Sequence, residues 1–159
     1  MKIRLTKDAQ GHATTLTCIR EDGTSTWQRS SDYMARHDLC HCAAESALGY
    51  TQGFLGLVAN GRDLWEFGTR NGERDEYTEQ ERWAEEIAGA LLWPDAEGME
   101  ALTDEGLYNL LLESLQKRGL EPPPVTLADF SAVRSRASEL LQRWQATPAG
   151  SKCEVDFPA

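Results

Sequence analysis

Two segments near the N-terminus, residues 2–8 and 14–20, alternate between apolar and polar side chains, and this short period is the strongest constraint on the fold. Alternation places successive side chains on opposite faces of a β-strand, whereas a helix repeats about every 3.6 residues. Asp22-Gly23 is a turn signal typical of β-hairpins. The pattern predicts a three-stranded antiparallel meander over residues 1–29, with strands near residues 2–8, 14–20 and 24–28.

Three strands comfortably bury only one face, so helices must cover that face of the sheet. Ser30, Ser31 and Asp32 are N-cap candidates for a helix that ends at Gly49. Capping boxes begin at Thr78 and Thr126, and apolar residues at helical spacing follow each of them. We expect a histidine-containing helix over 32–49, a short helix near 54–60, a helical body over 78–145 and an irregular tail over 147–159.

Together these elements predict an α+β fold in which the meander packs against a helical body of four to five helices. No proline- or glycine-rich linker separates two parts of different composition, and the meander is too small to be stable alone. We therefore expect residues 1–159 to form a single domain.

The chain is acidic, with 26 Asp and Glu residues against 16 Lys and Arg residues and a formal net charge of -10. This charge repels phosphate, so neither nucleic acid nor an anionic membrane surface is an expected partner. The N-terminus lacks the apolar core of a signal peptide, and no stretch approaches the roughly 20 apolar residues of a membrane span. We expect a cytoplasmic protein whose four cysteines are free thiols.

The run HDLCHCAAE, from His37 to Glu45, concentrates residue types that bind metals or transfer protons. Residues four apart lie on one face of a helix, so His37 and His41 can direct two imidazole nitrogens at one cation. Zinc and similar ions bind imidazole nitrogens at about 2.0 to 2.1 Å. The spacing predicts that these histidines contribute two ligands to a divalent-metal site.

A catalytic metal site needs a third protein ligand and a position left open for water. Glu45 lies four residues beyond His41 and so adds a third possible ligand on the same side of the helix. Its Cα is, however, about 12 Å along the helix from that of His37. Ligands could also come from outside the helix. The first candidates there are Asp63 and Glu66, because their segment follows the histidine helix most directly. The others are His12 and Cys18.

The five residues HDxxH, from His37 to His41, resemble the HExxH helix of zinc metallopeptidases. In that family the two histidines bind zinc and the acid polarises a zinc-bound water, so the resemblance implies that Asp38 is a general base. Aspartate is one methylene shorter than the glutamate of that family. The longer pattern HDxxHxxxExxLG, followed by GFxGLVAxG, is similar to a group of bacterial proteins that have no assigned function.

Two hypotheses follow. In the first, the protein binds zinc or another divalent metal and hydrolyses a small molecule, with Asp38 or Glu45 as base and with ligands drawn from His37, His41, Glu45 and Asp63. In the second, the histidines are buried and satisfied by hydrogen bonds, and the protein is a non-catalytic interaction module. The acids between Glu73 and Glu86 form either a solvated helix face or a surface for a basic protein partner.

Overall fold

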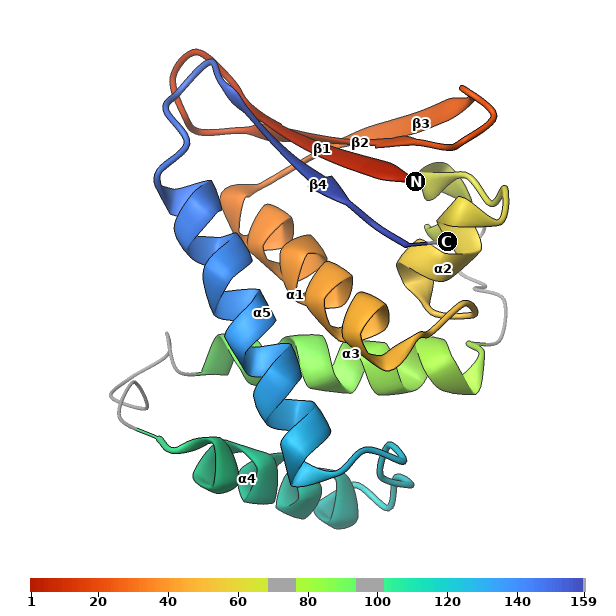
Figure 1. Cartoon of the computed structure of the whole chain (residues 1–159), viewed down its shortest axis with the longest axis vertical. Coiled ribbons are helices and arrows are strands. Elements are labelled where there is room, and N and C mark those ends of the chain that lie inside the picture. The colour runs from red at the N-terminus through yellow and green to blue at the C-terminus, as the bar shows by residue number, and fades with distance from the viewer. Residues whose placement is uncertain (69–76, 94–101, 159) are drawn as a thin grey trace.

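The computed structural model describes residues 1–68, 77–93 and 102–158 and confirms the predicted α+β fold (Figure 1). The meander consists of β1 (Lys2–Lys7), β2 (Thr14–Ile19) and β3 (Ser25–Ser30). Neighbouring strands are antiparallel, and β2 pairs with both β1 and β3. Gly23, in the turn between β2 and β3, has a φ of 86°, a left-handed conformation that glycine adopts without steric cost.

The irregular tail predicted for residues 147–159 is wrong in its second half. Lys152–Asp156 forms β4, which pairs antiparallel with β1, so the sheet of the described residues has the order β3-β2-β1-β4. Beyond β4, the backbone N–H of Phe157 donates to the Met1 carbonyl at 2.8 Å. Sequence alternation did exist here, but it covers only Cys153, Val155 and Phe157, too few positions to recognise a strand whose partner lies at the other end of the chain.

The sheet has one apolar face, which helices cover. Its inner side chains are buried and come from all the strands, among them Ile3, Leu16, Cys18 and Val155. Beneath them lies α1 (Asp32–Leu48), and α5 (Leu127–Gln145) runs beside α1 (Figure 1).

Both ends of α1 follow the sequence prediction. The hydroxyl of Ser31 accepts a hydrogen bond from the backbone N–H of Met34, which caps the N-terminus. Gly49 ends the helix with a φ of 67°, the left-handed conformation expected of a C-terminal glycine. The histidine helix predicted over 32–49 is therefore confirmed.

The other helices also match the expected pattern. They are α2 (Phe54–Ala59), α3 (Glu79–Leu92) and α4 (Asp104–Lys117), and a 3-10 turn η1 (Leu64–Phe67) follows α2. The predicted capping boxes are present at Thr78 and Thr126. None of the described helices is long and apolar enough to cross a membrane. Residues 73–76 of the acidic segment lie outside the described ranges.

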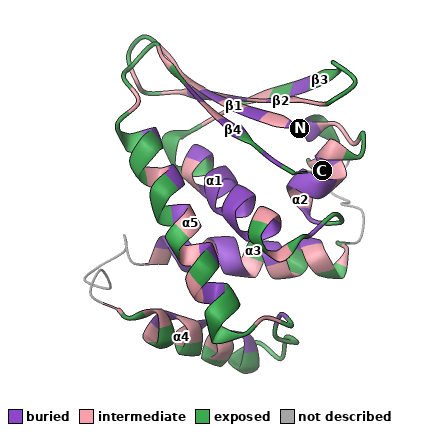
Figure 2. Ribbon diagram, in the orientation of Figure 1, coloured by how far each residue is buried: buried purple, intermediate pink, exposed green. Residues whose placement is uncertain are grey.

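Burial is concentrated on α1, where every residue from His37 to Glu45 is buried (Figure 2). The sheet, α2, α3 and α5 all pack around this helix. The cysteines are free and buried, as predicted, and burial raises the pKa values of Cys18, Cys40 and Cys42 to about 12. Burial therefore favours the protonated thiol at each of these three positions.

The newly identified C-terminal strand gives a test of the fold. Phe157→Ala should lower the free energy of unfolding by about 3 kcal/mol or more, because it empties a large apolar volume from the core. Asp156→Ala, at the exposed neighbouring position, should change it by no more than about 0.5 kcal/mol. Urea denaturation measures both variants. Equal losses in the two would show that the C-terminal segment does not pack against the sheet.

Candidate metal site

Three side chains from two helices converge beside the middle of α1. Nε2 of His41 lies 3.1 Å from Oε2 of Glu85 on α3, and Nε2 of His37 lies 3.5 Å from Oε1 of the same carboxylate. Taking one ligand atom from each residue, all three atoms lie within 4.8 Å of one another. Two atoms bound to one zinc ion lie about 3 to 3.5 Å apart. Small side-chain rotations would therefore bring all three onto a single ion.

The two histidines share a face of α1 because they are four residues apart. Their ring centroids are 4.8 Å apart and the planes meet at 66°, so the rings sit edge to face. Both imidazoles are inside the protein, but the Glu85 side chain is 52% exposed. The ring of Tyr33, also exposed, stacks on His37 with a centroid separation of 6.4 Å. The three-residue group thus lies at the protein surface, within reach of solvent.

Glu45 lies on the opposite side of the His41 ring from Glu85. Its Oε1 is 3.0 Å from Nδ1 of His41, and its Oε2 accepts a hydrogen bond from the backbone N–H of Gly56 at 3.0 Å. A hydrogen bond from Nδ1–H to a carboxylate orients the imidazole and leaves Nε2 available, which is the usual arrangement of metal-binding histidines. Glu45, a predicted ligand and base, is thus positioned to orient His41.

Gly53, the N-cap of α2, makes room for this carboxylate. A Cβ at Gly53 would lie 2.4 Å from Oε2 of Glu45, closer than any real contact. As the N-cap of α2, Gly53 also has no side chain to accept a hydrogen bond from the first turn. Glu45 provides that acceptor for Gly56, so one carboxylate caps α2 and orients His41.

The charges around the site act differently on the two histidines. Burial disfavours the charged form of His41, but the hydrogen bonds and charges of Glu45 and Glu85 outweigh it and raise the pKa of His41 to about 9. Burial and the charge of His41 lower the pKa of His37, with Glu85 acting against them. The two acids therefore favour the protonated form of His41, whereas burial favours the neutral form of His37.

Asp38, the predicted general base, is buried next to His37 in the chain. Its Oδ2 has no hydrogen-bond partner in the part of the chain that the structure describes. Burial raises the pKa of Asp38 to about 7, with the charge of His41 opposing the shift and Glu85 adding to it. An acid that titrates near neutral pH can both accept and donate a proton.

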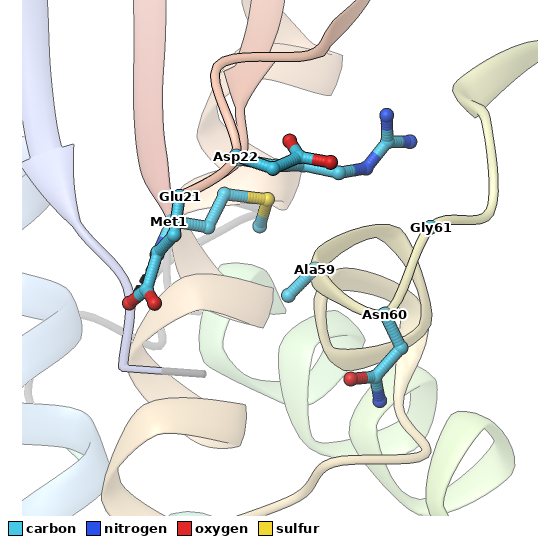
Figure 3. A pocket seen from close by; sticks show the side chains of 7 residues that line it. Met1, Glu21, Asp22, Ala59, Asn60 and Gly61 are labelled. Carbon is cyan, nitrogen blue, oxygen red and sulfur yellow. Dashed lines mark ion pairs between the residues drawn. The ribbon is translucent and has the colours of Figure 1, made fainter.

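Asp63, a predicted ligand, lies elsewhere in the structure. Its Oδ1 accepts a hydrogen bond from Arg20 at 2.8 Å, and Oδ2 accepts one from Trp65 at 3.2 Å. Arg20 also donates to the carbonyls of Val58 and Arg62. It borders a cavity of about 300 Å³, which Figure 3 shows with Met1 and Glu21 on one side and Ala59 and Asn60 on the other. The Arg20 ion pair connects the end of β2 to the segment after α2, and Asp63 does not belong to the group of potential metal ligands that the described residues form.

The three remaining predicted ligands from outside the histidine helix also lie elsewhere. Glu66 accepts a hydrogen bond from the backbone N–H of Asp63 and caps η1. His12 is exposed, and its backbone N–H donates to Asp8. Cys18 is buried on the inner face of the sheet. The structure does not bring any of these three beside the histidine pair.

Glu85 was not predicted as a site residue. The helix that carries it was expected from the capping box at Thr78, but acids occur at several positions of that helix, namely Glu79, Glu81, Glu85 and Glu86. The sequence period shows which side of α3 is apolar, and it does not show which acid faces α1. The packing of α3 against α1 selects Glu85, and only a tertiary structure contains that information.

The chain was also compared with known proteins. No protein-family model, no curated protein and no solved structure matches it.

The metal-free site gives a pH prediction. The pKa of His41 rises from its ordinary 6.5 to about 9 on folding, so the folded state holds a proton that the unfolded state releases. This stabilisation is complete below pH 6.5 and is lost as the pH rises through about 9. Urea denaturation of chelator-treated protein should show the free energy of unfolding falling over this range. His41→Gln should remove most of the fall, and the exposed His12→Gln should keep it. A fall of the same size in His41→Gln would contradict the prediction.

Proposed function

We propose that the protein binds a divalent metal ion, zinc or a similar ion, through Nε2 of His37, Nε2 of His41 and the carboxylate of Glu85. The observation that supports this most directly is the convergence of the three ligand atoms within 4.8 Å of one another. Metal-binding histidines usually donate their other ring N–H to a carboxylate or a carbonyl. The hydrogen bond between His41 and Glu45 matches this arrangement. Two imidazoles and one carboxylate suit Zn²⁺, Mn²⁺ and Fe²⁺ and leave positions for water or substrate.

We further propose that this site hydrolyses a small molecule. A bound divalent ion supplies an activated water and polarises the bond to be cleaved. Of the two predicted bases, Glu45 has hydrogen bonds to both of its carboxylate oxygens, whereas no described residue bonds to Oδ2 of Asp38. We therefore assign proton transfer to Asp38 and the orientation of His41 to Glu45.

A second candidate function is a non-catalytic interaction module with structural histidines. It is favoured by the fact that both ring nitrogens of His41 lie within hydrogen-bonding distance of carboxylate oxygens. An imidazolium between two acids is a complete polar cluster, and such clusters satisfy buried groups in many cores. The two candidates differ in whether the protein binds a metal at this cluster.

Metal content separates these candidates. Protein purified without chelator and dialysed against Zn²⁺ or Mn²⁺ should bind about one ion per chain, as measured by elemental analysis. The His37→Ala, His41→Ala double variant should bind none. Glu85→Gln should lower the affinity by about tenfold or more, because it replaces a charged ligand with a neutral one. Its matched control is Glu86→Gln, the next residue of α3, which forms an ion pair with Arg118.

Each outcome of this experiment has a consequence. Loss of the ion in the histidine variant and weaker binding by Glu85→Gln, with parent-like binding by Glu86→Gln, supports the proposed ligand set. Equal binding by the two glutamate variants would place the ion elsewhere. No bound ion in the parent protein would reject the metal hypothesis and support structural histidines. Circular dichroism of each variant checks that it is folded.

The hydrolase proposal is tested with metal-loaded protein on p-nitrophenyl esters, phosphates and amides. Asp38→Asn should keep the metal and lower turnover by about a hundredfold or more, because the amide cannot accept a proton. Absorbance of released p-nitrophenol, or of p-nitroaniline from the amides, gives the rate, and elemental analysis gives the metal content of the same sample. Turnover by Asp38→Asn at the parent rate would remove Asp38 from the mechanism. Absence of turnover by a metal-loaded parent on all three substrate classes would reject hydrolysis of such bonds.

A further inference from the structure

A groove of about 550 Å³ lies between α3 and the C-terminal end of α4. Its apolar lining includes Trp83 of α3, Leu115 of α4 and Leu120 beyond α4. Leu115 is buried, whereas Leu120 is 42% exposed. An exposed leucine beside a buried one gives the groove a hydrophobic surface that solvent can reach.

The C-terminus of α4 creates this surface. Gly119 ends the helix with a φ of 68°, and the backbone N–H of Leu120 then donates to the carbonyl of Leu115 at 3.0 Å. This hydrogen bond is that of a Schellman motif, in which the chain reverses and brings the residue after the glycine over the last turn. A Cβ at Gly119 would meet nothing within 4 Å, so the groove is open at this point.

The groove is also strongly acidic. Its lining holds four glutamates and one arginine, a formal charge of −3, and these residues are Glu79, Glu85, Glu86, Glu121 and Arg82. Arg118, next to the lining residue Gly119, pairs with Glu86 and offsets one of these negative charges. The whole chain has a net charge of -10, so its field also attracts cations. Charge complementarity therefore favours a positively charged occupant.

The spacing of the acids indicates the size of that occupant. Glu79 and Glu86 are seven residues apart on α3, which corresponds to about 10 Å along the helix axis. Glu121 adds a carboxylate from the opposite wall. A single small cation would meet one of these groups, whereas an extended peptide advances about 3.3 Å per residue and can meet several.

We propose that this groove binds a basic segment of a partner protein, in which lysine or arginine side chains flank one large apolar side chain. The basic side chains meet the glutamates at the two ends, and the apolar side chain lies on Trp83 and Leu120. Binding of this segment does not require a metal at the histidine site.

Fluorescence anisotropy with two labelled peptides tests the proposal on chelator-treated protein. The first peptide is Lys-Arg-Lys-Leu-Lys-Arg-Lys, and the second replaces its leucine with serine. The leucine peptide should bind at least about threefold more tightly, because its side chain leaves water. Leu120→Ser should remove this difference. Leu127→Ser, with 37% exposure at the start of α5, is the matched control and should keep it.

Two double variants test the contribution of the groove's glutamates to peptide binding. Glu79→Gln combined with Glu121→Gln should weaken both peptides by about fivefold or more. The matched control combines Glu105→Gln and Glu113→Gln, which remove the same charge from exposed positions of α4 outside the groove. Equal weakening by the two double variants, equal affinity for the two peptides, or no binding of either peptide would overturn the proposal.

Discussion

The candidate site depends on one buried carboxylate, that of Glu45. One of its oxygens bonds to Nδ1 of His41, and the other accepts the backbone N–H of Gly56 at the start of α2. The same group thus fixes the orientation of an imidazole and attaches α2 to α1. Loss of this carboxylate would leave a buried ring nitrogen and a buried amide without partners, and each such group is costly in a protein interior. Gly53 is necessary to the arrangement, since any side chain there would overlap the carboxylate.

This dependence arises because the most buried helix of the protein is not an apolar one. The sheet, α2, α3 and α5 surround α1, so the polar residues of its buried stretch, His37 to Glu45, are largely removed from water. His41 and Glu45 pair with each other, and His37 reaches Glu85 at the surface. Asp38 differs, because its Oδ2 lacks a partner among the described residues. Local departures from complete polar satisfaction are most often found at functional sites, which is why this helix is the place to look for function.

The sequence predicted local features well and long-range ones poorly. Capping residues and periodicity located α1, α3 and α5, because caps and amphipathic spacing act within a few residues. The pairing of β4 with β1 was missed, since it joins opposite ends of the chain. The residues of the candidate site show the same difference between local and long-range information. His37 and His41 were found from their four-residue spacing within one helix, whereas Glu85 comes from a different helix and was found only from the tertiary packing.

Glu85 connects the two proposals, because it lies in the candidate metal site and also lines the acidic groove. An ion bound to its carboxylate would neutralise part of the groove's lining charge of −3. A basic peptide that paired with Glu85 would in turn compete with the ion for the same oxygens. Linkage requires the two effects to be equal, so a metal that weakens the peptide by a given factor must itself be weakened by that factor. The shared carboxylate therefore makes metal and partner antagonists if the protein binds both.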